Sequence, residues 1–551
     1  MWVPDRVCLE SENAMTKDKI TKNVYYAMTV ILLLCGVAVM AFLSYYACRY
    51  SYYEEIAYRF RKQLLRDAVW RQILCFVIAA AFVYIVNRWF KMLRPEQAER
   101  ICRYTLVGVC VFAGVLGVFY ILYHPYYPEG DQINATAFAV YCREGDYSML
   151  SPGGYVGLYQ QQKGFGFLYE ILFTVFGNFN YTVAKILHVI WWVLAIIAGY
   201  GFLKLNTEKA VYRPVYCVIV LGCIPFLLYL PYIYGDVLSI SFSMILFWAV
   251  SAYEHSGKRR YVVLAAAVAA VSLLARKNTW IVLIGVFIYF VMVCLRKKTL
   301  RCLFAGMAIL LTAALSVKAV DKMYEYRSGY PSGIGIPSIL WVAMGLQESE
   351  GMAGFYNRYQ QTVFEENNFE QDVSARQGRD YIRGKMKEFA ENPSLAWDFM
   401  KRKLEGQWID PMFECLKSTE AFAADTPLPS GIQSLYYGTL HDIVWKIANR
   451  HQSIVYLAGL AYVVTVFAAG RKRQEMPAAV WLPMIVIVGG FLFSMVWEAK
   501  ARYAFPYYMF MILYAPEGMC RAAEIVAALI GKISRGRREE SGGKTKLRET
   551  A

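Results

Sequence analysis

Long apolar segments recur along the whole chain, and short polar stretches separate them. A transmembrane α-helix needs about 20 mostly apolar residues, and most of these segments approach that length. They cover residues 24–47, 71–90, 104–123, 181–203, 212–231, 236–253, 261–275, 279–296, 302–320, 452–470, 477–496 and 503–527. The ten-residue alternating strands of a membrane barrel are absent from the sequence. The pattern therefore predicts an all-α polytopic membrane protein with about twelve transmembrane helices.

Composition excludes several other classes of protein. Hydrophobic residues make up 58% of the 551 residues and charged residues 18%, whereas about 25% of the residues of soluble domains are charged. Intrinsic disorder is excluded because disordered chains are poor in apolar residues. The 13 cysteines are scattered, mostly inside apolar segments, without the Cys and His spacing of a metal site. They indicate core packing, not a disulfide framework.

The net charge of +16 is best explained by membrane topology. Basic residues collect in the cytoplasmic loops of membrane proteins, and no nucleic-acid-binding motif is present, so we expect no nucleic-acid partner. If the N-terminus is cytoplasmic and the spans alternate, most basic clusters fall on the cytoplasmic side, namely 91–103, 204–213, 258–260, 296–301, 471–473 and the tail from 532. Both termini of a multi-pass cell-membrane protein are then cytoplasmic. Loop 48–70 is the exception, because its basic residues fall outside.

The spans divide the chain into five expected parts. We expect an N-terminal two-helix membrane hairpin at 1–103, a catalytic transmembrane core at 104–320 with a first outer loop at 124–180, an extracytoplasmic and partly helical region at 321–450, C-terminal transmembrane helices at 451–530 and a basic cytoplasmic tail at 531–551. A connection as long as 321–450 is usually functional.

Carboxylates at the outer membrane edge are the first candidates for chemistry, because charges there are costly unless they are paired or wet. In the turn after the third span, prolines and Gly130 stop the helix and hold Glu129 and Asp131 just above the bilayer. Asp131, or Glu129 as its competitor, could act as a general base towards a hydroxyl group. Asp131 could equally cap the helix that follows. Asp236 could likewise be a helix cap, a second acid, or a metal or sugar ligand.

Basic residues at other outer span ends are the second set of candidates. Arg276 and Lys277 lie between two short spans, and Lys500 and Arg502 lie between the last two. They could bind a phosphate through charge-assisted hydrogen bonds, although Arg276 and Lys277 could also be snorkelling side chains of a hairpin turn. Neighbouring residues are candidates for substrate binding: His124, Tyr234, Glu498 and Tyr503.

Several short segments together resemble the GT-C superfamily of integral-membrane glycosyltransferases, which includes the protein O-mannosyltransferases. The acidic stretch 129–131 resembles the family's acidic outer loop, and 498–503 followed by Pro506 resembles a segment near the end of bacterial members. The segments 336–351 and 408–411 are similar to outer-loop segments of Gram-positive relatives. The acidic loop here follows the third span, not the first, so we interpret 1–103 as an addition before the core.

The resemblance implies transfer of a sugar from a polyprenyl-phosphate donor to an acceptor on the extracytoplasmic side. Asp131 would deprotonate the acceptor hydroxyl, which displaces the lipid phosphate in one inverting step. Arg276, Lys277 or Arg502, with Lys500 beside them, would stabilise the leaving phosphate. The acceptor is a glycan, lipid or protein. No cofactor is specified, and a divalent ion at Asp131 and Asp236 is compatible with the sequence but not required by it.

Two other classes of function remain open from the sequence. A flippase or exporter of lipid-linked saccharides would also span the membrane many times, although transporters usually contain internal repeats, and no clear repeat is found here. A ligase or polymerase of surface glycans could use the same outer basic residues. Asp131 discriminates between these classes, because a GT-C enzyme needs its carboxylate and a ligase acting through arginines does not.

Overall fold

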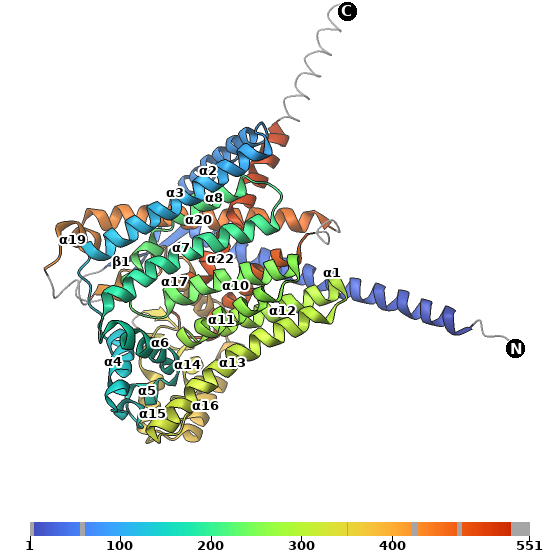
Figure 1. Cartoon of the computed structure of the whole chain (residues 1–551). Coiled ribbons are helices and arrows are strands. Elements are labelled where there is room, and N and C mark those ends of the chain that lie inside the picture. Colours follow the sequence, from blue (N-terminus) through green and yellow to red (C-terminus); the bar gives the residue numbers. More distant parts are fainter. Residues whose placement is uncertain (1–4, 56–60, 350, 421–426, 471–475, 531–551) are drawn as a thin grey trace, which may run out of the picture.

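The structure is a computed structural model, and it describes residues 5–55, 61–349, 351–420, 427–470 and 476–530. The predicted basic tail 531–551 and the basic cluster 471–473 lie outside the described residues. Helices dominate this part of the chain, in agreement with the predicted helical membrane protein (Figure 1).

Nine helices of the described residues are long and apolar enough to cross a membrane. They are α1 (Asp5–Arg49, apolar from Ile20), α2 (Val69–Phe90), α3 (Pro95–Tyr123), α7 (Tyr181–Asn206), α10 (Asp236–Ser256), α12 (Thr279–Lys297), α13 (Leu300–Ser328), α20 (Thr439–Ala468) and α21 (Trp481–Val496), which continues the 3-10 turn η5 (Ala478–Val480) into one segment, Ala478–Val496. The structure thus shows a membrane-embedded helical protein.

Three of the expected spans are shorter or interrupted. Segment 212–231 divides into α8 (Tyr212–Leu221) and α9 (Ile224–Leu228), because Pro225 cannot continue the helix that ends before it. Segment 261–275 forms α11 (Arg259–Ala275), which has only 17 residues. Segment 503–527 contains α22 (Phe505–Met511), a turn and a further helix from 515. Of the about twelve spans expected from the sequence, nine are therefore found as single helices of membrane-spanning length among the described residues.

The core of the bundle lies around α10. This helix packs against α7 and α11, and 78% of its apolar window is buried. Two serines of α10 bond within their own helix: the Ser239 hydroxyl donates to the carbonyl of Asp236 at 3.0 Å, and the Ser243 hydroxyl donates to the carbonyl of Ser239 at 2.7 Å. Such local bonds let polar residues lie in an apolar core without an unsatisfied donor.

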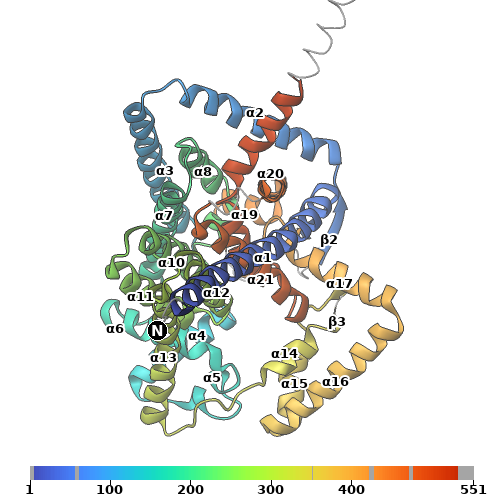
Figure 2. The same cartoon turned by 90° about the vertical axis from the view of Figure 1, so that its right-hand side faces the viewer.

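Region 48–70, which the sequence predicts as a simple loop, contains a two-stranded antiparallel hairpin. Strand β1 (Tyr50–Glu55) pairs with β2 (Arg61–Arg66), and the hairpin joins α1 to α2. Helix α1 packs against α20 and α21, and α2 packs against α20. The N-terminal segment is thus packed on the C-terminal helices of the bundle (Figure 2).

The two large connections between spans gather at the same end of the molecule, away from the first turns of α1 (Figure 1). The first contains α4 (Asp131–Glu144), η1 (Ser148–Leu150), α5 (Tyr155–Leu158), η2 (Gln160–Gln162) and α6 (Lys163–Phe176). The second contains α14 (Ser338–Met344), β3 (Glu348–Ser349), β4 (Met352–Ala353), α15 (Tyr359–Glu366), α16 (Gln371–Glu391), α17 (Pro393–Trp408), η3 (Lys417–Thr419) and α19 (Ser430–Tyr437). The helices of the second connection agree with the partly helical character expected for 321–450.

Candidate functional site

The turn after α3 places the predicted carboxylates at the end of the bundle. Gly130 has φ +55° and ψ −127°, a conformation that residues with a Cβ atom rarely adopt. The chain turns sharply there, and α4 begins at Asp131 itself. The residue in the N-cap position is therefore Gly130, and the expected capping role of Asp131 is not observed. The Asp131 carboxylate instead accepts a hydrogen bond from the Tyr155 hydroxyl at 3.2 Å.

One cavity, which we call the mixed-charge cavity, brings four of the predicted residues together. Its volume is about 320 Å³. Glu129 and Asp131 line it together with Lys500 and Arg502. The remaining lining residues are Gln132, Tyr232, Phe355, Tyr356, Glu414, Lys417 and Ser418. Three acidic and three basic residues therefore line the same open space.

A second cavity, the basic cavity, has a volume of about 200 Å³ and shares Arg502 with the first. It brings together Arg276, Lys277 and Arg502, which the sequence placed at separate span ends. The other lining residues are Gln161, Gln162, Tyr234, Ala275, Asn278, Ile336, Ser338, Trp341, Trp497 and Tyr503. Arg502 thus lies between the two cavities.

Two arginines of the basic cavity lie against the same two aromatic rings. The Arg276 guanidinium carbon is 5.2 Å from the Tyr234 ring centroid and 5.6 Å from that of Tyr503. The corresponding distances for Arg502 are 5.5 and 5.3 Å. Cation–π contacts of this kind stabilise a partly desolvated guanidinium. The rings therefore hold two like charges near each other, an arrangement that favours an anion in the cavity.

The two arginines differ in their polar partners. Arg276 forms an ion pair with Asp236, with 3.1 Å between Nη2 and Oδ1. Arg502 donates to the Tyr232 hydroxyl at 2.5 Å, and its Nε–H is buried without a hydrogen-bond partner among the described residues. Burial raises the pKa of Tyr232 to about 12, although Arg502 opposes the shift. The Tyr232 hydroxyl thus remains neutral, and Arg502 keeps its full positive charge towards a ligand.

Glu498 organises the short turn that carries the basic residues. Its carboxylate lies 2.9 Å from the Lys500 amine and accepts a hydrogen bond from the Tyr503 hydroxyl at 3.1 Å. Glu498 is buried. Its carboxylate neutralises the charge of Lys500 and orients the Tyr503 side chain. Burial lowers the pKa of Lys277, which also lines the basic cavity.

Asp236 and His124 do not line either cavity. Asp236 is buried at the first residue of α10, and its carboxylate pairs with Arg276. His124 is fully buried among aromatic rings, and its Nε2 lies 3.2 Å from the Tyr436 hydroxyl. Burial lowers its pKa to about 4. The expectation that His124 contacts substrate is therefore not supported, because its ring is enclosed by protein.

An apolar groove adjoins the basic cavity. It lies between α6, α7 and α10 and has a volume of about 200 Å³. Tyr234 is part of the wall of both spaces. The groove is otherwise lined almost entirely by apolar and aromatic side chains, including Phe165, Leu172, Leu187, Trp191, Leu238 and Phe242.

Some residues of the site were not predicted from the sequence. Glu414 and Lys417 lie just beyond the motif-like segment 408–411, but nothing in their spacing connects them to Asp131. Trp341 and Trp497 stack with 6.0 Å between their ring centroids and 11° between their planes, and both line the basic cavity. Trp341 lies in segment 336–351, which resembles an outer-loop segment of the GT-C family, and this resemblance was the only indication in the sequence that Trp341 belongs to the site.

Neither a search for metal-binding clusters nor comparison with known proteins adds an assignment for the site. Among the described residues, no group of three or more His, Cys, Asp and Glu side chains could hold a metal ion. No protein family model, no curated protein and no solved structure matches the chain.

Proposed function

We propose that this protein is a membrane glycosyltransferase that moves a sugar from a polyprenyl-phosphate donor to an acceptor outside the membrane. The observation that carries the proposal is the shared wall between the basic cavity and the apolar groove. A lipid phosphate combines an anionic head with a long apolar tail. The basic cavity would bind the head, and the apolar groove would bind the tail. The GT-C resemblance of the sequence supports the same donor.

The donor phosphate would occupy the basic cavity. Arg276, Lys277 and Arg502 supply positive charge there, and Arg502 has a buried N–H available for an oxyanion. Hydrogen bonds from a guanidinium to phosphate are charge-assisted and frequently bidentate. The isoprenoid tail would follow the groove between α6, α7 and α10, where apolar contacts replace those with lipid.

The acceptor would bind in the mixed-charge cavity. Its hydroxyl oxygen attacks the anomeric carbon of the donor while the Asp131 carboxylate takes the hydroxyl proton. The bond between the anomeric carbon and the phosphate oxygen breaks, and its electron pair leaves with the polyprenyl phosphate. Arg502 lies between the two cavities, so it can stabilise the charge that develops on that oxygen. Aromatic side chains such as Tyr356 offer a flat surface for a sugar ring.

The placement of both large connections at one end of the bundle supports an extracytoplasmic site. The basic clusters of the sequence put this end outside the cell membrane and the termini inside. Glycan, lipid and protein acceptors all carry the hydroxyl that the reaction requires.

A donor-cleavage assay tests the proposal. The purified protein in lipid nanodiscs is incubated with a panel of polyprenyl-monophosphate sugars and an acceptor mixture, and released polyprenyl monophosphate is measured. Loss of one charge-assisted bond costs about 1.5–3 kcal/mol, so Arg502→Ala should reduce release roughly ten- to a hundredfold. Arg383→Ala, at an exposed arginine of α16, is the matched control.

The assay also separates the rival class of function. Wild-type protein that releases no polyprenyl phosphate from any donor would contradict glycosyl transfer. Movement of an intact lipid-linked saccharide across proteoliposomes, without cleavage, would identify a flippase instead.

A further inference from the structure

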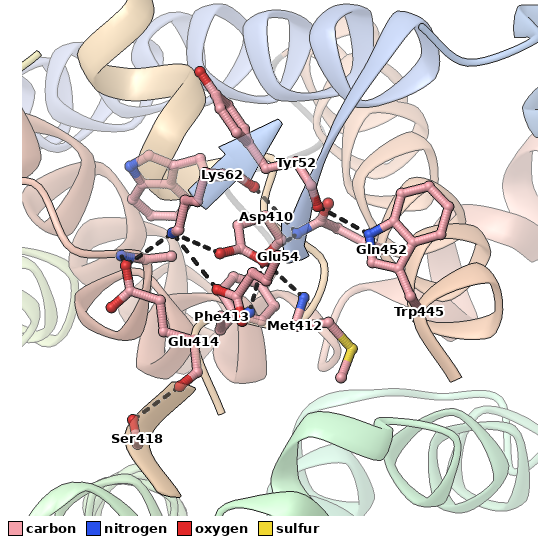
Figure 3. Close-up of polar contacts among 12 residues, drawn as sticks. Tyr52, Glu54, Lys62, Asp410, Met412, Phe413, Glu414, Ser418, Trp445 and Gln452 are labelled. Carbon is pink, nitrogen blue, oxygen red and sulfur yellow. Dashed lines mark hydrogen bonds and ion pairs between the residues drawn. The ribbon is translucent and has the colours of Figure 1, made fainter. Parts of the chain in front are cut away.

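A buried ionic cluster connects the N-terminal hairpin to the mixed-charge cavity. Lys62 of β2 reaches the turn after α17, where its amine lies 2.7 Å from Asp410 and 2.8 Å from Glu414 (Figure 3). Glu54, directly opposite on β1, lies 3.8 Å from the same amine. The side chains of Lys62 and its two close partners are almost inaccessible to solvent. We call these four residues the Lys62 cluster.

The charges of the Lys62 cluster balance within the protein. Burial alone would raise the pKa of Glu414, but Lys62 and Lys417 outweigh it and lower the pKa to about 2. Burial and the neighbouring Asp410 raise the pKa of Glu54 well above its ordinary value. Burial therefore favours the neutral form of Glu54, which leaves the carboxylates of Asp410 and Glu414 opposite the cations of Lys62 and Lys417. A buried charge is tolerated only when it is paired in this way.

The cluster also fixes backbone on both sides of the cavity. Asp410 accepts hydrogen bonds from the N–H groups of Met412 and Phe413 at 3.0 and 3.1 Å, which shapes the turn that leads to Glu414. Glu414 accepts a hydrogen bond from the N–H of Ala501 at 3.3 Å. Ala501 lies between Lys500 and Arg502, and Glu414 itself lines the mixed-charge cavity. The Glu414 carboxylate thus binds Lys62 and also the backbone of the 500–502 turn, which carries Lys500 and Arg502.

We infer that Lys62 is a positioning residue: it fixes Glu414 and, through Glu414, the 500–502 turn, so that Lys500 and Arg502 face the cavities. The N-terminal hairpin then completes the site without contacting a substrate. The effect on ligand binding rests on the proposed function, whereas the effect on the turn does not.

Hydrogen exchange tests the effect on the turn. Amide exchange is measured by mass spectrometry on the full-length protein, in peptides covering 497–505. Lys62→Met removes the charge, and Lys62→Gln removes it but keeps a hydrogen-bond donor. We expect exchange in 497–505 to become at least about tenfold faster, the factor that corresponds to 1.4 kcal/mol of lost local stability. Lys62→Arg should restore near-wild-type exchange. Arg66→Met, at an exposed cation of the same strand, is the matched control.

Binding of farnesyl phosphate, followed by the intrinsic tryptophan fluorescence to which Trp341 and Trp497 of the basic cavity contribute, is the second readout. The dissociation constant should rise about tenfold in Lys62→Gln and stay unchanged in Arg66→Met. A wild-type protein that does not bind this probe would count against the proposed function, while the exchange data would still decide the role of Lys62. Faster exchange confined to 50–66 and 408–414 would overturn the inference. Failure of both uncharged variants to fold would also overturn it, because Lys62 would then be required for folding as a whole.

Discussion

At the scale of single residues, Asp131 is the group on which the proposed chemistry depends. It is exposed, it begins α4, and the Tyr155 hydroxyl orients its carboxylate. A negative charge in the first turn of a helix is stabilised by the helix dipole. Its position combines access from water with closeness to Arg502, which shares its cavity.

Asp131→Asn should abolish most of the activity without unfolding the protein. The amide keeps the size and the hydrogen bond of the carboxylate but removes its basicity, so turnover should fall at least about a hundredfold. Glu144→Gln, at the exposed far end of the same helix, should leave turnover unchanged. Donor cleavage and thermal unfolding are measured in parallel. Turnover of Asp131→Asn within a fewfold of wild type would transfer the role of the base to Glu129.

The burial of Lys403 makes the free energy of unfolding depend on pH. Its amine is buried and donates to the carbonyl of Gly345 at 2.5 Å, and burial lowers its pKa to about 7. An unfolded lysine keeps its proton to about pH 10.4. Between these values the unfolded chain binds more protons, so stability rises with pH; below about 7 both states are charged and the cost of burying the charge is fully present.

We therefore expect the melting temperature of wild type to rise relative to that of Lys403→Met between pH 7 and pH 10. Lys401→Met, at a partly exposed lysine of the same helix, should show no such difference. Parallel pH dependence of wild type and Lys403→Met would contradict the assignment.

The sequence identified many residues of the site but not the contacts behind them. Prolines, Gly130 and the charges at span ends are local signals, and they were sufficient to select Asp131, Arg276 and Arg502. Lys62 carried no such signal, because its partner Asp410 is 348 residues away and a basic residue in an outer loop is usually solvated. The burial of His124 could not be predicted for a related reason: nothing local shows that the Tyr436 ring of α19 stacks on it.

At the scale of the elements, the groove between α6, α7 and α10 gives the site its expected preference for a lipid. Helix α6 lies between two spans and packs against α11, so it closes one side of an apolar space that neighbouring spans leave open. Each CH₂ group buried in such a space contributes about 0.8 kcal/mol. A longer isoprenoid tail should therefore bind more tightly.

Leu187→Trp should obstruct the groove. The larger side chain occupies the space of the tail, so the dissociation constant of farnesyl phosphate should rise at least about tenfold, while binding of inorganic phosphate stays unchanged. Ile190→Trp, on the exposed face of the same helix, is the control. An equal loss for both probes would show instead that the substitution disturbs the basic cavity.

The interruptions of the spans could not be predicted from the apolar pattern. Apolar content located the helices, but it does not distinguish a full span from the broken pair α8 and α9 or from the short α11. Those interruptions depend on Pro225 and on the turn at Arg276 that brings this arginine to the cavity. The β1–β2 hairpin was missed because its pairing depends on docking against the segment after α17.

At the scale of the whole molecule, both large connections lie at one end of the helical bundle. Charge asymmetry between loops predicts that this end faces the outside. Cysteines introduced at Asp146 and Lys387 in these connections should react with an impermeant thiol reagent in intact cells, whereas one at Lys258 should react only after lysis. All three residues are exposed. Protection of both outer positions in intact cells would reverse the orientation.

The Lys62 cluster has a consequence for biosynthesis. Lys62 leaves the ribosome long before Asp410 and Glu414, which are 348 and 352 residues further along. At about 5–20 residues per second, the interval is on the order of tens of seconds. During that time the segment after α17, on which the hairpin docks, has not been synthesised. Helices α1 and α2 must therefore enter the membrane while the β1–β2 hairpin between them is still exposed to water. The cation of Lys62 is solvated at that stage and is buried only when the last third of the chain arrives.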